Sequence, residues 1–163
     1  MVQEHVAMCP GSFDPVTLGH LHVIERATRL FGRVIVSVAE DTEKEPLFSV
    51  EERVEMLREA CADLDNVEVD SFAGLVVEHA RKRGAVTLVK GLRAVSDFEA
   101  EFQMTLTNRR LARDIETTFV ITDAEYAFLS SSVVNEVARL GGDVSAWVPQ
   151  PVVQRLREKF GPA

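Results

Sequence analysis

The chain has 163 residues, of which 46% are hydrophobic and 27% are charged, and its formal net charge is −8. This length and composition predict one globular domain over residues 1–163 and argue against a disordered or collagen-like chain. The acidic balance argues against a nucleic-acid-binding protein, which needs a basic face, and no apolar run approaches the roughly 20 residues of a membrane span. We therefore expect a cytoplasmic protein whose partners are neither nucleic acids nor membranes.

Five short runs of mainly apolar, often β-branched residues alternate with segments of helical length. These runs cover residues 6–8, 34–38, 67–69, 86–89 and 118–121. The second and fourth runs lack a clean polar alternation, which is typical of strands buried on both faces of a parallel sheet. The pattern predicts an α/β fold, namely a Rossmann-like parallel sheet of five strands in the order 3-2-1-4-5, with helices on both faces and further helices at the C-terminal end.

The segments between and after these strands carry helix-start signals. Ser49 and Glu52 form a capping box for the second helix, in which each side chain can satisfy a free backbone N–H. Ser132 is predicted to cap the fifth helix. A fourth helix is predicted over residues 96–112, and its apolar spacing indicates that it buries Phe98, Phe102 and Leu106.

The two cysteines, Cys9 and Cys61, lie far apart and form no C-x-x-C motif. No histidine stands at a zinc-ligand spacing from either, so neither a zinc site nor a disulfide framework is indicated. Cys61 falls on the apolar stripe that the second helix turns inward, which contains Val50, Val54, Leu57, Cys61 and Leu64. We interpret both cysteines as buried thiols.

Residues 9–20 form a glycine-bearing turn that leaves the first strand and opens the first helix. Gly11 would let the backbone approach a ligand, and the free N–H groups and dipole at a helix start favour an anion. We therefore predict a phosphate cradle with His20 directed at the anion. The alternative is a core histidine bonded to a carbonyl, because His20 shares its helical face with Ile24, Ala27 and Phe31.

Cationic side chains follow three of the predicted strands. His20 follows the first strand, Lys44 follows the second, and Lys90 and Arg93 stand at the end of the fourth. Ligands of open parallel sheets bind beyond the carboxyl ends of the strands, so these side chains are predicted to meet at one rim and to bind a phosphate-rich ligand. Neither a P-loop nor a G-x-G-x-x-G motif is present. For Lys44, a solvated loop charge is the alternative.

Several short motifs in a fixed order resemble one enzyme family. They are Gly11-Ser12-Phe13-Asp14-Pro15, Thr17-Leu18-Gly19-His20, Lys90-Gly91-Leu92-Arg93, Asp97-Phe98-Glu99, Phe128-Leu129-Ser130-Ser131-Ser132 and Gly142-Asp143-Val144. Together they resemble bacterial phosphopantetheine adenylyltransferase, within the nucleotidyltransferase superfamily, over nearly the whole chain. The resemblance implies an enzyme of coenzyme A biosynthesis that makes dephospho-coenzyme A and pyrophosphate from ATP and 4′-phosphopantetheine with Mg²⁺, as a homohexamer. It also implies coenzyme A as a possible feedback ligand.

The same resemblance implies roles for individual residues. His20 would stabilise the transition state, with Lys44 and Arg93 as further catalytic residues, and Ser12 would contact both ATP and the acceptor phosphate. The positions that match those holding 4′-phosphopantetheine are Lys44, Val76 and Lys90. The positions that match those holding ATP are Ser12, Phe13, His20, Gly91, Leu92, Arg93, Glu101, Tyr126, Ala127, Phe128, Leu129, Ser130, Ser131 and Ser132. No protein ligand is assigned to the metal.

The chain departs from the commonest pattern of the family at a few positions. It has Ser12 in place of threonine, Leu18 in place of asparagine, Lys90 in place of arginine, and the pair Tyr126-Ala127 in place of tryptophan-serine. Ser12 keeps the hydroxyl group and Tyr126 keeps an aromatic ring. Lys90 keeps the charge but lacks the planar fork that binds phosphate in a bidentate manner. None of these changes removes a group that the reaction requires.

Other functions of the same fold remain as alternatives. Nicotinamide mononucleotide adenylyltransferases would need an arginine near Asn135, and cytidylyltransferases usually carry a histidine at the position of Thr17. Class I tRNA synthetases need a longer chain and a surface for the acceptor stem. A non-catalytic nucleotide-binding module is a further alternative, against which the presence of His20, Lys44, Arg93 and the serine run argues.

Overall fold

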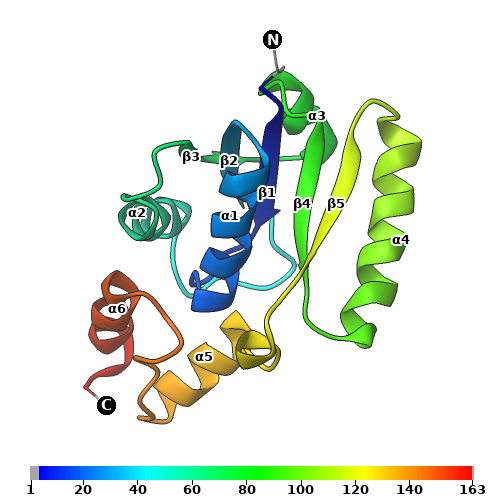
Figure 1. Ribbon diagram of the computed structural model, residues 1–163. Helices are drawn as coiled ribbons and strands as arrows, with labels where there is room; N and C mark the ends of the chain where they lie inside the picture. The colour runs from blue at the N-terminus through cyan, green and yellow to red at the C-terminus, as the bar shows by residue number, and fades with distance from the viewer. Residues whose placement is uncertain (1–3, 163) are drawn as a thin grey trace.

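The computed structural model describes residues 4–162, apart from the side chains of residues 95 and 96. Five parallel strands form one sheet in the order β3-β2-β1-β4-β5 (Figure 1), as predicted. The strands are β1 (Val6–Gly11), β2 (Arg33–Ala39), β3 (Val67–Phe72), β4 (Thr87–Leu92) and β5 (Glu116–Ile121). Most reach further than predicted at their carboxyl ends because the ladder continues there, for example between Gly11 and Val38. The site loops therefore begin on rigid backbone.

Six α-helices surround the sheet and close its carboxyl end. They are α1 (Leu18–Leu30), α2 (Val50–Ala60), α3 (Val76–Lys82), α4 (Val95–Leu111), α5 (Ser131–Arg139) and α6 (Gln150–Phe160), with a short 3₁₀ helix at Ala124–Tyr126. The capping box of Ser49 and Glu52 is present at α2, as predicted. In Figure 1 strands β1, β4 and β5 run downward, and α5 and α6 lie below them. Within the described residues, no helix combines the length and apolar character needed to cross a membrane.

Two apolar cores cover the two faces of the sheet. Successive residues of β1 divide between them, because Ala7 and Cys9 pack in one core and Met8 in the other. Helices α1, α2, α5 and α6 contribute residues to the larger core. Helix α3 and the segment after α4 contribute residues to the smaller core. The thiols of Cys9 and Cys61 are buried, as predicted.

The predicted burial of the apolar face of α4 is wrong. Phe98, Phe102 and Leu106 are 45%, 48% and 54% exposed. The reason is that α4 stands apart from the helices that cover the sheet (Figure 1), and among the described apolar side chains of this region it is Ala112 and Ile115, after the helix, that enter a core. The apolar spacing thus identifies a helical face correctly, but this chain alone does not cover that face.

The predicted cap of α5 is also wrong by two residues. Ser130 occupies the N-cap position, and its hydroxyl accepts a hydrogen bond from the Val133 N–H at 3.2 Å. Ser131 and Ser132 lie inside the first turn. Any of three consecutive serines can serve as an N-cap, and the chain path from β5 decides which of them does so.

Candidate active site

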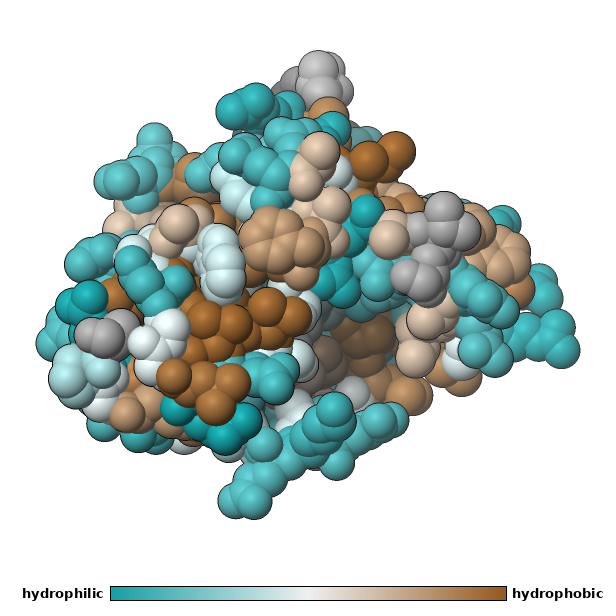
Figure 2. All heavy atoms as spheres, turned by 90° about the horizontal axis from the view of Figure 1, so that it is seen from below, coloured by the Kyte–Doolittle hydropathy of each residue, from teal (hydrophilic) through white to brown (hydrophobic). Residues whose placement is uncertain are grey.

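A cavity of about 280 Å³ opens beyond the carboxyl ends of β1 and β4. At these two strands the order of the sheet reverses, which is where open α/β sheets bind ligands. Figure 2 views this end of the molecule from below and shows a hollow between the larger part on the left and the smaller part on the right. The turn after β1, the helix α1, the end of β4 and the segment before α5 line the cavity. The fold thus places four separate segments around one space.

The turn after β1 has an unusual backbone at Phe13. Its φ angle is +48°, in the left-handed region that non-glycine residues seldom adopt. The Phe13 side chain is buried, and its ring lies edge-on to the His20 ring with 5.0 Å between the centroids. A Cβ at Gly11 would lie 3.1 Å from the Phe13 ring, so the missing side chain at Gly11 makes room for that ring. Gly11 therefore shapes the turn by packing, which the sequence does not reveal.

His20 lines the cavity, and its imidazole is held by the cap of α1. Nδ1 accepts the backbone N–H of Thr17 at 3.0 Å, while the Thr17 hydroxyl accepts the backbone N–H of His20. Desolvation by burial, with the charge of Arg93 as a smaller cause, lowers the pKa of His20 from 6.5 to about 4. At neutral pH the ring is uncharged, and because Nδ1 is an acceptor, its proton resides on Nε2. The imidazole is thus a fixed neutral N–H donor.

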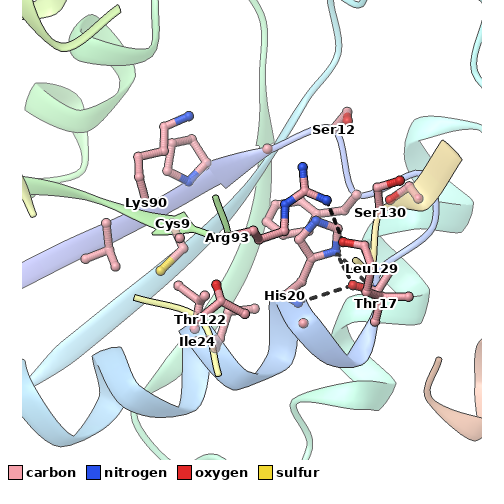
Figure 3. A pocket seen from close by; sticks show the side chains of 18 of the residues that line it. Cys9, Ser12, Thr17, His20, Ile24, Lys90, Arg93, Thr122, Leu129 and Ser130 are labelled. Carbon is pink, nitrogen blue, oxygen red and sulfur yellow. Dashed lines mark hydrogen bonds between the residues drawn. The ribbon is translucent and has the colours of Figure 1, made fainter. Parts of the chain in front are cut away.

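Two cations share the cavity with His20, and each is paired with a carboxylate of α4. The Arg93 guanidinium donates to the Leu129 carbonyl at 2.6 Å and to Asp97 at 3.0 Å, and it lies beside the His20 ring (Figure 3). The Lys90 ammonium stands 3.7 Å from a carboxylate oxygen of Glu101. Both cations are therefore positioned and partly neutralised by one helix.

A second cavity of about 480 Å³ adjoins the first and shares Ser12 and Ser131 with it. Lys44 and Ser132 line this second space. Ser131 also donates its hydroxyl proton to the Pro15 carbonyl at 2.7 Å, which attaches the start of α5 to the turn after β1. The two cavities together can hold two ligands that meet near Ser12.

Comparisons with known proteins agree with this geometry. The Cytidylyltransferase-like family model matches residues 8–137. Phosphopantetheine adenylyltransferase of Desulforudis audaxviator is 56% identical over 156 residues, which cover 96% of each chain, and that of Heliobacterium modesticaldum is 55% identical over 96% of this chain and 93% of its own. The chain belongs to the phosphopantetheine adenylyltransferase family. A solved structure of a candidate nicotinate-nucleotide adenylyltransferase from Vibrio parahaemolyticus has a TM-score of 0.72, covering 99% of this chain and 98% of its own, and at 17% identity it supports the fold alone.

Most residues that the family resemblance singles out reach one of the two cavities. The first is lined by Ser12, Phe13, His20, Lys90, Gly91, Arg93, Glu101, Leu129, Ser130 and Ser131, and the second by Ser12, Lys44, Ser131 and Ser132. The side chains of the two lysines and Arg93 thus lie at one end of the sheet. Their roles toward the substrates stay predictions.

Five residues of the same set line neither cavity in this structure: Val76, Leu92, Tyr126, Ala127 and Phe128. Val76 begins α3 and packs against the smaller core. The Tyr126 ring lies 5.4 Å from that of His22, and Phe128 is 55% exposed beside Trp147. Their predicted contacts with the substrates stay predictions.

Two further residues are tied to the site although the sequence did not single them out. Thr122, which follows β5, lines the first cavity. Arg53 of α2 is 1% exposed and bonds to the turn after β1. A signal for Arg53 was available, because it stands three residues after Val50 on the apolar stripe of α2. A charged residue on the inward face of a helix indicates a side chain that is buried and held by hydrogen bonds.

The described residues do not form a metal cage of their own. They contain no cluster of three His, Cys, Asp or Glu side chains that could hold an ion. Asp14 is the acidic side chain of the β1 turn, but its two carboxylate oxygens accept the N–H groups of Leu47 and Phe48 at 2.8 and 2.9 Å. Asp14 therefore joins the turn after β1 to the segment before α2.

Proposed function

We propose that this protein transfers the adenylyl group of ATP to 4′-phosphopantetheine, giving dephospho-coenzyme A and pyrophosphate. The observation that carries the proposal is the neutral, capped imidazole of His20 beside Arg93 in the cavity at the β1–β4 switch point. It occurs in a chain whose relatives of more than 50% identity are named phosphopantetheine adenylyltransferases. The family, the fold and the chemistry of the site thus point to one reaction.

The reaction needs no general base. A phosphate monoester has a second pKa of roughly 6, so the acceptor is already an oxyanion at neutral pH. One of its oxygens forms a bond to the α-phosphorus of ATP, and the bond from that phosphorus to the bridging oxygen breaks, so that pyrophosphate leaves with the electron pair. The protein must hold two anions in line and stabilise the charge that builds on the α-phosphoryl oxygens.

His20 is suited to the second task. Its Nε2–H can donate to an α-phosphoryl oxygen, and the bond from Thr17 to Nδ1 fixes both the ring orientation and the tautomer. The lowered pKa of His20 keeps the ring neutral and therefore in one donor form across the physiological pH range. The imidazole then acts by positioning a hydrogen-bond donor and carries no proton to or from the substrates.

The cations are suited to the first task. Lys90 and Arg93 face the cavity, and Lys44 faces the adjoining one, so an anion that spans both spaces meets positive charge from two sides. Phosphate oxygens would compete with Asp97 and Glu101 for Arg93 and Lys90. The cost of that exchange is moderate, because these side chains are partly exposed and their ion pairs are correspondingly weak.

We propose that magnesium arrives with ATP. Mg²⁺ dehydrates reluctantly and is commonly held by phosphate oxygens and waters, with few protein ligands, which suits a site whose acidic residues are engaged elsewhere. When bound, the ion would supply charge neutralisation on the phosphate chain. The tasks assigned to His20, Lys90 and Arg93 stand without a metal held by the protein.

We also propose that the protein assembles as a homohexamer in the cytoplasm, as the family resemblance implies. The exposed apolar face of α4 supports an assembly, because apolar patches of this size seldom face water in monomers. This face includes Phe98, Phe102 and Leu106, and Met104 and Leu111 are exposed on the other side of the helix. Feedback by coenzyme A stays a prediction; it is chemically reasonable because coenzyme A contains the whole product.

The test measures pyrophosphate release from ATP and magnesium with one acceptor at a time. The acceptors are 4′-phosphopantetheine, nicotinamide mononucleotide, glycerol phosphate and choline phosphate, with pantetheine as the control that lacks the attacking phosphate. We expect release with 4′-phosphopantetheine only, together with one equivalent of dephospho-coenzyme A by mass spectrometry. Preference for any other acceptor, or release with pantetheine, would reject the proposed substrate.

A further inference from the structure

Arg53 is an almost fully buried charge that lies close to the site without lining it. Its side chain is 1% exposed, on the inward face of α2. A guanidinium is always protonated at physiological pH, and burying it is costly unless hydrogen bonds compensate. Its position therefore calls for a specific set of partners.

All the acceptors that Arg53 contacts are main-chain carbonyl oxygens. Nε donates to Phe48 at 3.1 Å and to Ser49 at 3.3 Å, where the segment that carries Lys44 enters α2. Nη1 donates to Ser12 at 2.8 Å and to Ala39 at 3.0 Å, at the turn after β1 and at the end of β2. One planar group therefore fixes the ends of three segments relative to each other.

The bond to Ser12 falls next to the unusual backbone of Phe13. The Ser12 carbonyl lies on one side of Phe13, whose φ angle is +48°, and the Asp14 carboxylate lies on the other. Asp14 accepts the N–H groups of Leu47 and Phe48, directly before the residues that Arg53 contacts. Both ends of a strained residue are thus attached to the same segment, so the strained conformation is held from outside the turn.

The orientation of the Ser12–Phe13 peptide follows from this bond. In a trans peptide the C=O and N–H groups point in opposite directions, so a carbonyl bonded to Arg53 turns the Phe13 N–H away from Arg53. Within residues 4–162 that N–H donates to no protein acceptor, and both Ser12 and Phe13 line the first cavity. It is available to an anion there.

We propose that Arg53 is a positioning residue for the adenylyl transfer. It holds the Ser12–Phe13 peptide so that the Phe13 N–H can donate to a phosphoryl oxygen, and it fixes the base of the segment that carries Lys44. The expected effect on the rate rests on the proposed function. The geometric part of the proposal, namely the orientation of the Phe13 N–H, does not, because it applies to any phosphate ligand. Arg53 acts through the backbone and touches neither substrate.

Three variants separate this role from a purely structural one. Arg53→Lys keeps a buried charge and can reach some carbonyls, but an ammonium cannot span Ser12 and Phe48 as a planar fork does. Arg53→Met keeps much of the side-chain volume without any donor. Arg58→Met is the matched control, because Arg58 is exposed on the same helix and makes only a 3.5 Å contact with the Val69 carbonyl. Thermal unfolding followed by circular dichroism gives a temperature at which every variant is fully folded, and the assays are run at that temperature.

The kinetic readout is the split between kcat and KM. A misplacement of about 1 Å at a reacting centre can cost about 10²-fold in rate, so we expect Arg53→Lys to lower kcat by roughly 10- to 100-fold. We expect the KM for ATP to change less than about threefold, since Gly91, Leu129 and Ser130 of the cavity wall are not attached to Arg53. A folded Arg53→Lys protein with the kcat of the wild type would overturn the proposal, as would a loss of rate that Arg58→Met shares.

The spectroscopic readout does not depend on turnover. The chain has nine phenylalanines, so ¹⁵N-phenylalanine labelling gives few amide signals, and a Phe13→Tyr sample assigns the one from position 13. A non-hydrolysable ATP analogue with magnesium should shift the Phe13 signal in the wild type and in Arg58→Met, and shift it at most half as far in Arg53→Lys. Equal shifts in all three proteins would refute the geometric part. Failure of the acceptor assay would reject the proposed function and leave this measurement interpretable.

Discussion

Replacing His20 tests two tasks that the structure assigns to one side chain. His20→Ala removes the Nε2–H donor in the cavity and also the Nδ1 acceptor that caps Thr17. His20→Gln retains the cap, because glutamine at the third helical position is a normal partner in a capping box and its amide oxygen can accept the Thr17 N–H. The glutamine also keeps amide N–H donors, so it can replace part of the proposed donor role, whereas alanine removes that role entirely.

The expected magnitudes follow from these contacts. Losing a donor aimed at the transition state costs about 10²–10³ in kcat, which is roughly 3–4 kcal/mol, and we expect this loss in His20→Ala and a smaller one in His20→Gln. Losing the cap costs about 1 kcal/mol of folding free energy, which corresponds to a fall in Tm of about 2–4 °C for a chain of this size. We expect that fall in His20→Ala and a smaller one in His20→Gln.

Steady-state pyrophosphate release gives kcat and both KM values, and calorimetry gives the Tm. Both measurements use the same preparations, with ATP binding by titration calorimetry as the control for an intact cavity. Turnover of His20→Ala within threefold of the wild type would refute the donor role of His20. An unchanged Tm in His20→Ala would refute the importance of the cap.

Three further predictions follow from the site and its surroundings. As the pH falls from about 6.5 to 4, His20 binds a proton in the unfolded chain but not in the folded chain. The free energy of unfolding of the wild type, measured by urea titration relative to His20→Gln, should therefore decrease by at most about 3 kcal/mol as the pH falls through this range. Lys90→Met removes a charge from the cavity and should raise the KM for 4′-phosphopantetheine about 10- to 100-fold, with a smaller change for ATP. Phe102→Glu places a charge on the exposed face of α4 and should lower the mass measured by light scattering, whereas an unchanged mass would exclude this face as an assembly contact.

The fold was predictable because its signals are local. Strand runs, the Ser49–Glu52 capping box and the turn before α1 each depend on residues that are close in sequence. The alternation of these elements restricts the topology to a parallel sheet, and the carboxyl ends of its strands then locate the site. In this way the positions of His20, Lys90 and Arg93 at one end of the sheet followed from the sequence.

The surroundings of those residues required the tertiary structure. The Nδ1 bond that sets the His20 tautomer is local, but the burial of the ring and the nearby charge of Arg93, which lower its pKa, arise only in the folded chain. Arg53 reaches Ser12 across 41 positions of the chain, which no short-range pattern encodes.

The sequence by itself determined which segments form strands, helices and turns, and therefore the sheet and the end at which the candidate site lies. Only the tertiary structure decided that Phe98, Phe102 and Leu106 face outward, because periodicity defines a helical face without stating what covers it. It also decided that Arg53 is buried beneath the turn, because a hydrogen bond between distant segments depends on how they pack.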